Sequence, residues 1–340
     1  MREPAFWYRP ASWKSHLLRP LAAIYGAVAA HRLKRRGLNA GIPVFCVGNY
    51  HGGGAGKTPT VRALADLLRE LGETPVVLSR GYRGRLRGPV RVDASRHDAG
   101  DVGDEPLMLS QYVPVVVSRD RADGVALAKS MAATVILMDD GFQNPAVAKD
   151  ASFIVIDARR GVGNAQVMPS GPLRAPLAEQ IERTDALIVI GEGRAADAVA
   201  SVVAGQNKPV LRARFRPDEA SLSALRGKRV LAFAGIGDPA RFFATLSGAG
   251  IDVARTRVFA DHHPLTQGEI DGLVAAAGRE GLVLVTTEKD VARLQSGGEL
   301  PDRLRGVIPF KVTLAFDDAT ALRAFVSAKL FESRDVRRTT

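Results

Sequence analysis

A glycine-rich run between a predicted strand and a predicted helix constrains this chain more than any other feature. The apolar run Val44–Val47 predicts a buried strand, and the apolar spacing within Val61–Leu71 predicts a helix soon after it. Residues 51–58 lie between them and read His-Gly-Gly-Gly-Ala-Gly-Lys-Thr. Glycines let backbone N–H groups surround phosphate oxygens, and a helix N-terminus adds partial positive charge. The run therefore predicts a phosphate-binding loop in an α/β protein.

The residues of this loop have separate expected roles. Lys57 is expected to reach the terminal phosphates of a nucleotide, and the Thr58 hydroxyl to bind Mg²⁺. The usual pattern has glycine where His51 stands, and a glycine-rich turn with a surface lysine is the alternative interpretation. That alternative does not account for Lys-Thr at this position. The predicted nucleotide-binding residues are His51, Gly52, Gly53, Gly54, Ala55, Gly56, Lys57 and Thr58.

Beyond the loop, continuous β-branched runs alternate with helical patterns, which is typical of a parallel sheet covered by helices. We predict an α/β fold with a P-loop NTPase-type parallel sheet, a second, smaller α/β lobe and an N-terminal amphipathic helix. The expected strands of the main sheet after the first are Val76–Leu78, Val115–Val117, Val135–Met138, Phe153–Ile156 and Ala186–Ile190. The expected parts are a basic and aromatic helix over 1–38, a P-loop core over 39–225, a second lobe closing the active-site cleft over 226–330, and a tail over 331–340.

The positive charge of the chain is concentrated at its N-terminus. The net charge is +11, and the first forty residues hold eight Lys and Arg against the single acid Glu3. The same segment holds both tryptophans, Trp7 and Trp13, and the ten-residue apolar stretch Leu21–Ala30. That stretch is shorter than the roughly 20 residues that a spanning helix needs. Two interpretations stay open, a helix lying at a membrane surface and a helix docked on the protein's own core with solvated arginines.

Composition excludes several other classes. No basic stripe recurs and no nucleic-acid recognition motif is present, so a nucleic-acid partner is not expected. The single cysteine, Cys46, excludes an intramolecular disulfide framework and a cysteine-based zinc site. No obligate protein partner is inferred.

Acidic residues follow the expected strand Val135–Met138, where the chain reads Asp139-Asp140-Gly141. Carboxylates at the carboxyl end of a buried strand near a phosphate loop can hold Mg²⁺ or its water shell. A plain turn is the alternative. We interpret Asp139 and Asp140 as metal-site residues because an apolar strand precedes them.

Two further constellations are candidates for handling the acceptor of a transferred phosphate. One is Gly-Asp-Glu-Pro with Asp104 and Glu105, which alone is also a common way to begin a helix. The other is Asp-His-His-Pro with His262 and His263, in which a histidine can orient a catalytic carboxylate. A loop leading into a helix, or a fortuitous metal pair, are the alternatives for the histidines. Arginines at strand ends are candidates for clamping phosphates, although single arginines are more often solvated: Arg80, Arg119 and, in a loop rich in Pro and Gly, Arg174.

The ordered set of motifs resembles the tetraacyldisaccharide 4′-kinase family, the lipid A 4′-kinases. The resemblance runs from the N-terminal segment to about residue 325, and its pieces are Val-Gly-Asn, Gly-Gly-Ala-Gly-Lys-Thr-Pro, Ser-Arg-Gly-Tyr, Gly-Asp-Glu-Pro, Asp-Asp-Gly-Phe-Gln, Pro-Ser-Gly-Pro-Leu-Arg, Asp-His-His and Thr-Glu-Lys-Asp. It implies ATP- and Mg²⁺-dependent phosphorylation of the 4′-hydroxyl of a tetraacylated glucosamine disaccharide 1-phosphate. The expected place is the cytoplasmic face of the inner membrane, with the acylated lipid as partner.

The resemblance also implies roles for individual residues. Asp104 would act as base toward the sugar hydroxyl, with His262 supporting it. Asn144 stands where the family pattern usually has histidine. Glu105, Asp139 and Asp140 match acidic positions at the metal and nucleotide, and Gln143 and Arg174 match positions facing the ligands. Two other hypotheses stay open, a soluble P-loop kinase or synthetase with a small polar substrate and a nucleotide-dependent binding module.

Overall fold

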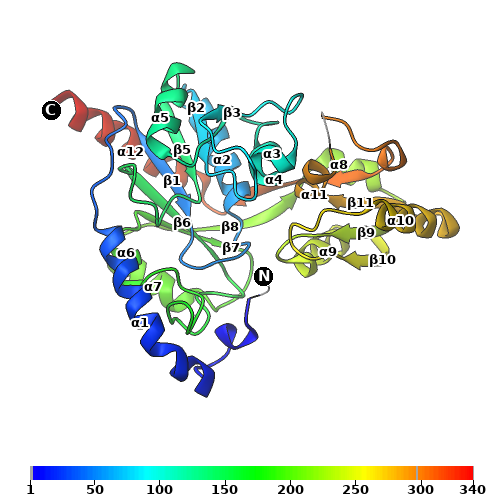
Figure 1. Ribbon diagram of the computed structural model, residues 1–340, viewed down its shortest axis with the longest axis horizontal. Helices are drawn as coiled ribbons and strands as arrows, with labels where there is room; N and C mark the ends of the chain where they lie inside the picture. The colour runs from blue at the N-terminus through cyan, green and yellow to red at the C-terminus, as the bar shows by residue number, and fades with distance from the viewer. Residues whose placement is uncertain (1–2, 296–297, 340) are drawn as a thin grey trace. The chain divides into compact units, whose positions relative to one another are not determined.

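The computed structural model describes residues 3–295 and 298–339, and the chain divides into two compact units (Figure 1). The first, called the phosphate-loop unit below, comprises Met1–Arg80, Ser118–Arg214 and Leu314–Thr340. The second unit comprises Gly81–Val117 and Phe215–Thr313. Each unit is therefore built from stretches that are separate in the sequence.

A parallel sheet forms the centre of the phosphate-loop unit, as the sequence predicts. Its strands follow the order β13, β8, β7, β6, β1, β5, β2, and all pairs from β8 to β2 are parallel. Every residue of β1, β2, β5, β6 and β7 is buried, which requires cover on both faces of the sheet. The strands are β1 (Val44–Gly48), β2 (Pro75–Ser79), β5 (Val135–Asp139), β6 (Ala151–Asp157), β7 (Ala186–Ile190), β8 (Val210–Pro217) and β13 (Val312–Phe316).

Helices of this unit follow the strands as crossover connections. The buried side chains Val61, Leu64 and Leu68 of the helix after the loop recur at helical spacing, so one face of that helix enters the core. The helices are η1 (Ala5–Tyr8), α1 (Trp13–Leu33), α2 (Lys57–Glu70), α5 (Arg121–Ser130), α6 (Leu177–Glu182), α7 (Asp197–Gly205) and α12 (Ala319–Thr339). Residues 331–339, set apart as a tail from the sequence, are the last part of α12.

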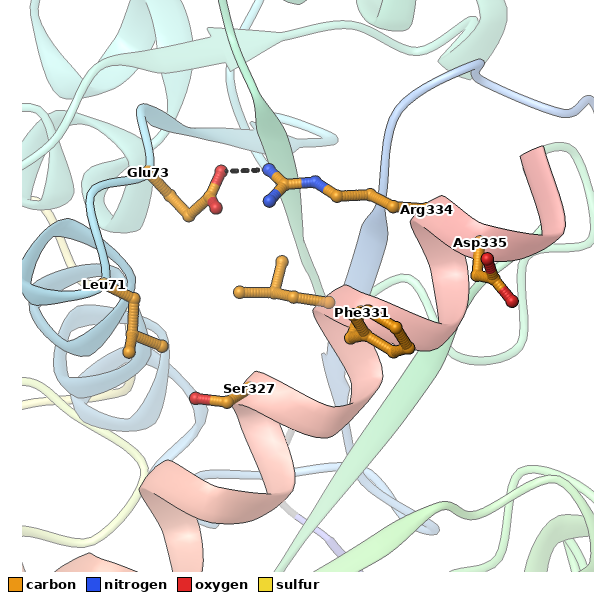
Figure 2. A pocket seen from close by; sticks show the side chains of 7 residues that line it. Leu71, Glu73, Ser327, Phe331, Arg334 and Asp335 are labelled. Atoms are coloured by element: carbon orange, nitrogen blue, oxygen red, sulfur yellow. Dashed lines mark hydrogen bonds and ion pairs between the residues drawn. The ribbon is translucent and has the colours of Figure 1, made fainter. Parts of the chain in front are cut away.

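Helix α12 lies beside the end of α2 around a small cavity, which Figure 2 shows from close by. The cavity has a volume of about 350 Å³. The Arg334 guanidinium of α12 donates to the Glu73 carboxylate at 2.6 Å, and the Thr134 hydroxyl donates to the same oxygen at 2.6 Å. The Glu73 side chain is only 7% exposed, so this pair anchors α12 to the unit more firmly than a surface ion pair does. The lining residues are Leu71, Glu73, Ser327, Leu330, Phe331, Arg334 and Asp335.

Helix α1 turns mainly small residues toward the protein and most of its large apolar residues outward. A Cβ added at Gly26 would lie 3.5 Å from the Pro176 side chain and 3.7 Å from that of Val167. The buried residues of the helix are Ser15, Ala22, Gly26 and Leu33. The exposed ones include Trp13, Leu17, Leu21, Ile24, Tyr25 and Val28. The helix therefore does pack on the protein, while most of its large apolar side chains stay exposed, so both interpretations drawn from the sequence remain open. Within the described residues, no helix has the length and hydropathy that crossing a membrane requires.

The second unit holds its own parallel sheet, with strands in the order β10, β9, β11, β12. Two apolar clusters flank it, one including Phe242 and Leu246 of α9 and the other Ile270 and Leu273 of α10. A short antiparallel pair, β3 with β4, also belongs to this unit. Its elements are β3 (Val90–Arg91), α3 (Ala99–Val102), α4 (Asp104–Leu109), β4 (Val115–Val117), α8 (Glu219–Leu225), β9 (Arg229–Ala234), α9 (Pro239–Gly248), β10 (Asp252–Val258), α10 (Gln267–Glu280), β11 (Val283–Thr287), α11 (Glu288–Leu294), η2 (Asp302–Leu304) and β12 (Ile308–Phe310).

The units differ from the sequence-based parts in three stretches. Residues 81–117, placed in the core from the sequence, belong to the second unit because α4 packs against α11. Residues 215–225, the end of the predicted core, also belong to the second unit. Residues 314–330, placed in the second lobe, return to the phosphate-loop unit with α12. A single boundary at residue 225 cannot predict units built from separate stretches of the chain, because the sequence pattern is local and these assignments depend on long-range packing.

Candidate active site

The phosphate loop connects β1 to α2 and is shaped by its own backbone. Asn49 donates from Nδ2 to the Gly53 carbonyl at 3.4 Å, and the Ala55 amide donates to the same carbonyl at 3.1 Å. Gly56 closes the loop with a φ of +97°, a left-handed conformation that favours glycine. Helix α2 begins at the next residue, Lys57, so the unpaired N–H groups of its first turn lie at the loop.

Two carboxylates end β5 beside the strand that leads into the loop. Asp139 is the register partner of Val47, and Asp140 follows it in a left-handed conformation with φ of +50°. The Asp140 carboxylate lies 2.8 Å from an Arg174 guanidinium nitrogen and 3.9 Å from Lys57 Nζ. Burial alone would raise the pKa of Asp140, but the charges of Lys57 and Arg174 outweigh it and lower that pKa to about 2. The structure thus brings the predicted Lys57, Asp140 and Arg174 into one cluster.

Gln143 and Arg174 tie this cluster to the end of β1. Gln143 donates from Nε2 to the Asn49 carbonyl at 2.8 Å, and it accepts from Arg174 Nη1 at 3.3 Å. The Arg174 amide donates to the Tyr50 carbonyl at 2.9 Å. Buried Gln180 donates to the same carbonyl at 3.3 Å. Asn49, Tyr50 and Gln180 were not predicted as site residues, although Asn49 stands in the Val-Gly-Asn motif.

His51 stands in the loop without needing the freedom of glycine. It forms an isolated antiparallel bridge with Leu173, an extended conformation that any residue adopts. Its side chain is buried, with the residue 1% exposed, and burial lowers the pKa of the ring to about 4. A neutral imidazole therefore replaces the expected glycine.

The predicted arginines at strand ends lie at neighbouring positions. Arg80 directly follows β2, Arg119 is the second residue after β4, and both are exposed. Directly before them, the Ser118 amide donates to the Ser79 carbonyl at 3.0 Å. A third arginine, Arg121, was not predicted. It is 2% exposed, and burial lowers its pKa while the charge of Asp139 acts to raise it. The electrostatic effect of Asp139 on Arg121 has no signal in the local sequence.

The donor atoms at the end of β5 and the start of α2 fit Mg²⁺. They are oxygens, from the Thr58 hydroxyl and the carboxylates of Asp139 and Asp140, and Mg²⁺ in nucleotide sites uses one or two carboxylates with phosphate oxygens. A ready-made cluster of three or more His, Cys, Asp or Glu ligands does not occur in residues 3–295 and 298–339. Glu105 belongs to the second unit, where its carboxylate lies 3.1 Å from Lys289 Nζ. Its role at a metal stays a prediction.

Asp104 is the centre of a charged cluster in the second unit. Its side chain is 5% exposed, and its Oδ2 lies 2.8 Å from His262 Nδ1 and 2.9 Å from Arg293 Nη2. Lys289 Nζ lies 4.0 Å from the same oxygen. Burial alone would raise the pKa of Asp104, but the hydrogen bond with His262 and the charge of Lys289 outweigh it and hold that pKa well below its usual range. Asp104 is therefore a carboxylate at every physiological pH.

The two adjacent histidines have different surroundings. His262 has a left-handed backbone with φ of +59°, and its ring lies against Asp104 and against the Tyr82 ring, with centroids 5.8 Å apart. His263 stacks on Phe259 with centroids 5.9 Å apart, and its Nε2 lies 3.0 Å from the Glu269 carboxylate. Glu269 is the third residue of α10 and completes its capping box with the N-cap Thr266, so His263 belongs to a helix start. This geometry favours His262 as the partner of Asp104.

The Thr-Glu-Lys-Asp motif supplies the cations of the cluster. The Thr287 hydroxyl caps α11 by accepting from the Asp290 amide at 3.1 Å, and Asp290 accepts from the buried Gly235 amide. Lys289 and Arg293, one turn apart on α11, both reach Asp104. The carboxylates of Glu105 and Asp104 outweigh the effect of burial and raise the pKa of Lys289. The sequence shows this motif only as one piece of the family resemblance, and Arg293, which lies outside it, was not predicted as a site residue.

Gly103 explains why glycine precedes Asp104. Its φ is +92°, and a Cβ there would lie 2.6 Å from the Tyr82 carbonyl oxygen. The Ser-Arg-Gly-Tyr and Gly-Asp-Glu-Pro motifs are thus in backbone contact. Any larger residue would push Asp104 and its helix away from that contact.

Comparison with known proteins gives a consistent result for nearly the whole chain. The LpxK family, described as tetraacyldisaccharide-1-P 4′-kinase, matches residues 14–331. The chain belongs to the tetraacyldisaccharide-1-P 4′-kinase family. A tetraacyldisaccharide 4′-kinase of Bradyrhizobium diazoefficiens is 65% identical over 337 residues, covering 99% of each chain. One from Rhodopseudomonas palustris (strain BisB18) is 66% identical over 338 residues, covering 99% of this chain and 98% of its own.

A solved structure of the same family agrees with the fold. The "apo" form of LpxK from Aquifex aeolicus, crystallised in complex with ATP, matches with a TM-score of 0.72 and 25% identity, covering 93% of this chain and 99% of its own. The resemblance drawn from the motifs and the predicted fold class are confirmed. The roles of single residues in this member of the tetraacyldisaccharide-1-P 4′-kinase family stay predictions.

The buried His51 predicts a specific loss of stability in acid. Because its pKa in the folded protein, about 4, is below the ordinary value near 6.5, protonation favours the unfolded chain as pH falls through this window. Between pH 7.5 and pH 5.0 this group should cost about 2 kcal/mol of unfolding free energy. Urea unfolding of a His51→Gln variant at both pH values should show a smaller acid loss by that amount. An exposed histidine changed in the same way, His31→Gln, is the control, and equal acid losses in wild type and His51→Gln would contradict the expectation.

Proposed function

We propose that the protein transfers the γ-phosphate of ATP to the 4′-hydroxyl of a tetraacylated glucosamine disaccharide 1-phosphate. The observation that carries the proposal is the buried Asp104–His262 pair, set among cations, in a family member that also has a complete phosphate loop. Phosphoryl transfer needs positive groups at the phosphates and an oriented acceptor oxygen. The two units supply these two kinds of group.

In the phosphate-loop unit, the backbone N–H groups of the loop and of the start of α2 bind phosphate oxygens, and Lys57 meets the terminal phosphates. Its ion pair with Asp140 keeps the ammonium at the loop. Thr58, Asp139 and Asp140 would hold Mg²⁺, which when bound neutralises charge on the phosphate oxygens. Arg80, Arg119, Gln143 and Arg174 are proposed to bind the phosphates of the ligands.

In the second unit, Asp104 is proposed to accept the proton of the acceptor hydroxyl. As the oxygen–phosphorus bond to the acceptor forms, the bond from the γ-phosphorus to the bridging oxygen breaks and ADP leaves. A carboxylate held well below its usual pKa is a weak base, but a loose transition state requires positioning more than base strength. Nδ1 of His262, 2.8 Å from the carboxylate, can share the proton that arrives there.

The exposed side of α1 supports a place at the surface of the inner membrane, on its cytoplasmic face. Six large apolar side chains there point away from the protein, and exposed basic residues lie at both ends of the helix. Rings and apolar chains enter the headgroup layer, while cations gain roughly 1 kcal/mol each from anionic lipid. A surface of this kind would bring the kinase to an acylated substrate that remains in the bilayer.

A phosphorylation assay with labelled ATP tests the proposal. The protein should phosphorylate a tetraacylated disaccharide 1-phosphate that lacks the 4′-phosphate, and it should act poorly on the same sugar after deacylation. Product analysis should place the label at the 4′ position, and Lys57→Ala provides an inactive control. Equal activity on the deacylated sugar would support a soluble kinase of small polar substrates instead.

Substitutions in the second unit should separate the two histidines. Asp104→Asn should abolish most turnover, and His262→Ala should lower kcat by about 10²–10⁴-fold with a smaller effect on KM, because it acts on the proton and not on binding. His263→Ala is the matched control, since that ring pairs with Glu269. A larger loss of kcat in His263→Ala than in His262→Ala would overturn the assignment.

The apolar side of α1 should determine binding to vesicles. The double substitution Leu17→Glu and Ile24→Glu should lower co-sedimentation with anionic vesicles at least tenfold, because two side chains that leave water on binding become charged. The control pair Val202→Glu and Val258→Glu changes exposed apolar residues elsewhere. If both pairs leave binding unchanged, α1 is not the membrane-binding surface.

A further inference from the structure

The N-terminal segment places an acidic side chain at the phosphate loop. A Cβ added at Gly53 would lie 2.9 Å from Glu3 Oε1, and one at Gly52 would lie 3.5 Å from the same oxygen. Glu3 is the only acidic residue among the first forty. It therefore sets a negative charge beside a loop whose geometry suits phosphate.

The same carboxylate is incompletely satisfied. Oε2 accepts from the Tyr8 hydroxyl at 3.0 Å and pairs with the Arg160 guanidinium. Oε1 is buried, and within residues 3–295 and 298–339 no donor reaches it. Burying a carboxylate oxygen without a hydrogen-bond donor costs free energy. An anion whose oxygens all find donors at the loop could therefore displace the Glu3 carboxylate.

Arg160 is positioned by the end of β6, the strand paired with β1. The Arg160 amide donates to Asp157 Oδ1 at 2.8 Å, which fixes the turn after that strand. Its guanidinium lies over the Tyr8 ring at 4.4 Å, and its Nη1 would be 3.4 Å from a Cβ at Gly53. The charge of Arg160 acts on the buried His51 ring together with that of Lys57. A forked, permanently charged donor thus lies at the phosphate loop.

We propose that Arg160 binds the phosphates of the nucleotide and that Glu3 occupies its guanidinium when no nucleotide is bound. A triphosphate then takes over the guanidinium as a charge-assisted, forked hydrogen-bonding partner, and Glu3 is released from it. The step is an exchange of ion pairs, with no bond made or broken. It rests on the proposed function only in taking ATP as the nucleotide.

Equilibrium binding of Mg²⁺–ATP, by titration calorimetry on the full chain, tests this exchange. Arg160→Gln should weaken binding about tenfold, and Arg160→Lys should fall between it and wild type, because the charge is kept while the fork is lost. Glu3→Gln should tighten binding severalfold, since the guanidinium is no longer occupied. Tripolyphosphate should show the same order of affinities, because the contact is to phosphate and not to the base.

Two control variants measure how far the loss of one charge near the site changes ATP affinity by itself. Arg159→Gln changes an exposed neighbour whose amide bonds the same Asp157 oxygen, and Glu182→Gln changes an exposed acid of α6. In the double variant Glu3→Gln, Arg160→Gln, the gain from Glu3→Gln should disappear, because Glu3 acts through Arg160.

Three results would overturn the proposal. They are ATP affinity in Arg160→Gln equal to that in Arg159→Gln, weaker binding in Glu3→Gln than in wild type, and full additivity in the double variant. Circular dichroism and thermal unfolding of each variant show whether it is folded. If Arg160→Gln does not fold, the comparison of Arg160→Lys with wild type still tests the proposal. A protein that binds ATP as expected but does not phosphorylate the lipid would contradict the proposed function and leave this exchange supported.

Discussion

The parallel pairing of β1 with its two neighbours is the constraint on which the phosphate-loop unit depends. Parallel strands end at the same edge of a sheet, so the loop after β1, Asp139 and Asp140 after β5, and the turn with Arg160 after β6 are brought to that edge. These segments are far apart in the sequence. The register that pairs Val47 with Asp139 therefore decides whether a carboxylate lies beside the loop.

The two units use buried charge in the same way. Asp140 is held between Lys57 and Arg174. Asp104 is held among Lys289 and Arg293 of α11 and His262 of the loop before α10. In each case the attraction to cations exceeds the cost of burial, so the carboxylate stays ionised. Such groups hold donors and metal ions in place with little dependence on pH. This suits a reaction in which positioning contributes more than strong acid–base chemistry.

The sequence predicts the features that are local in the chain and misses those that depend on packing. The loop, the strand before it and Asp139-Asp140 are contiguous patterns, and the structure has them where the pattern places them. Arg293 and Arg160 carry no local signal, because their partners lie on distant segments. The sequence also left undecided whether the apolar side of α1 faces the protein or the outside, since helical spacing identifies a face but not what covers it. The discontinuous units have the same cause.

The N-terminal segment connects the apolar side of α1 with the phosphate loop through one stretch of backbone. Asn164 bonds the carbonyl of Trp7 at 2.7 Å and the Ser15 hydroxyl at 3.3 Å, so the start of α1 is attached to the turn that follows Arg160. Glu3 precedes these anchors and reaches the loop itself. The same stretch of backbone therefore carries both the start of α1 and the carboxylate that meets Arg160, so the position of Glu3 depends on how this segment is anchored to the turn after β6.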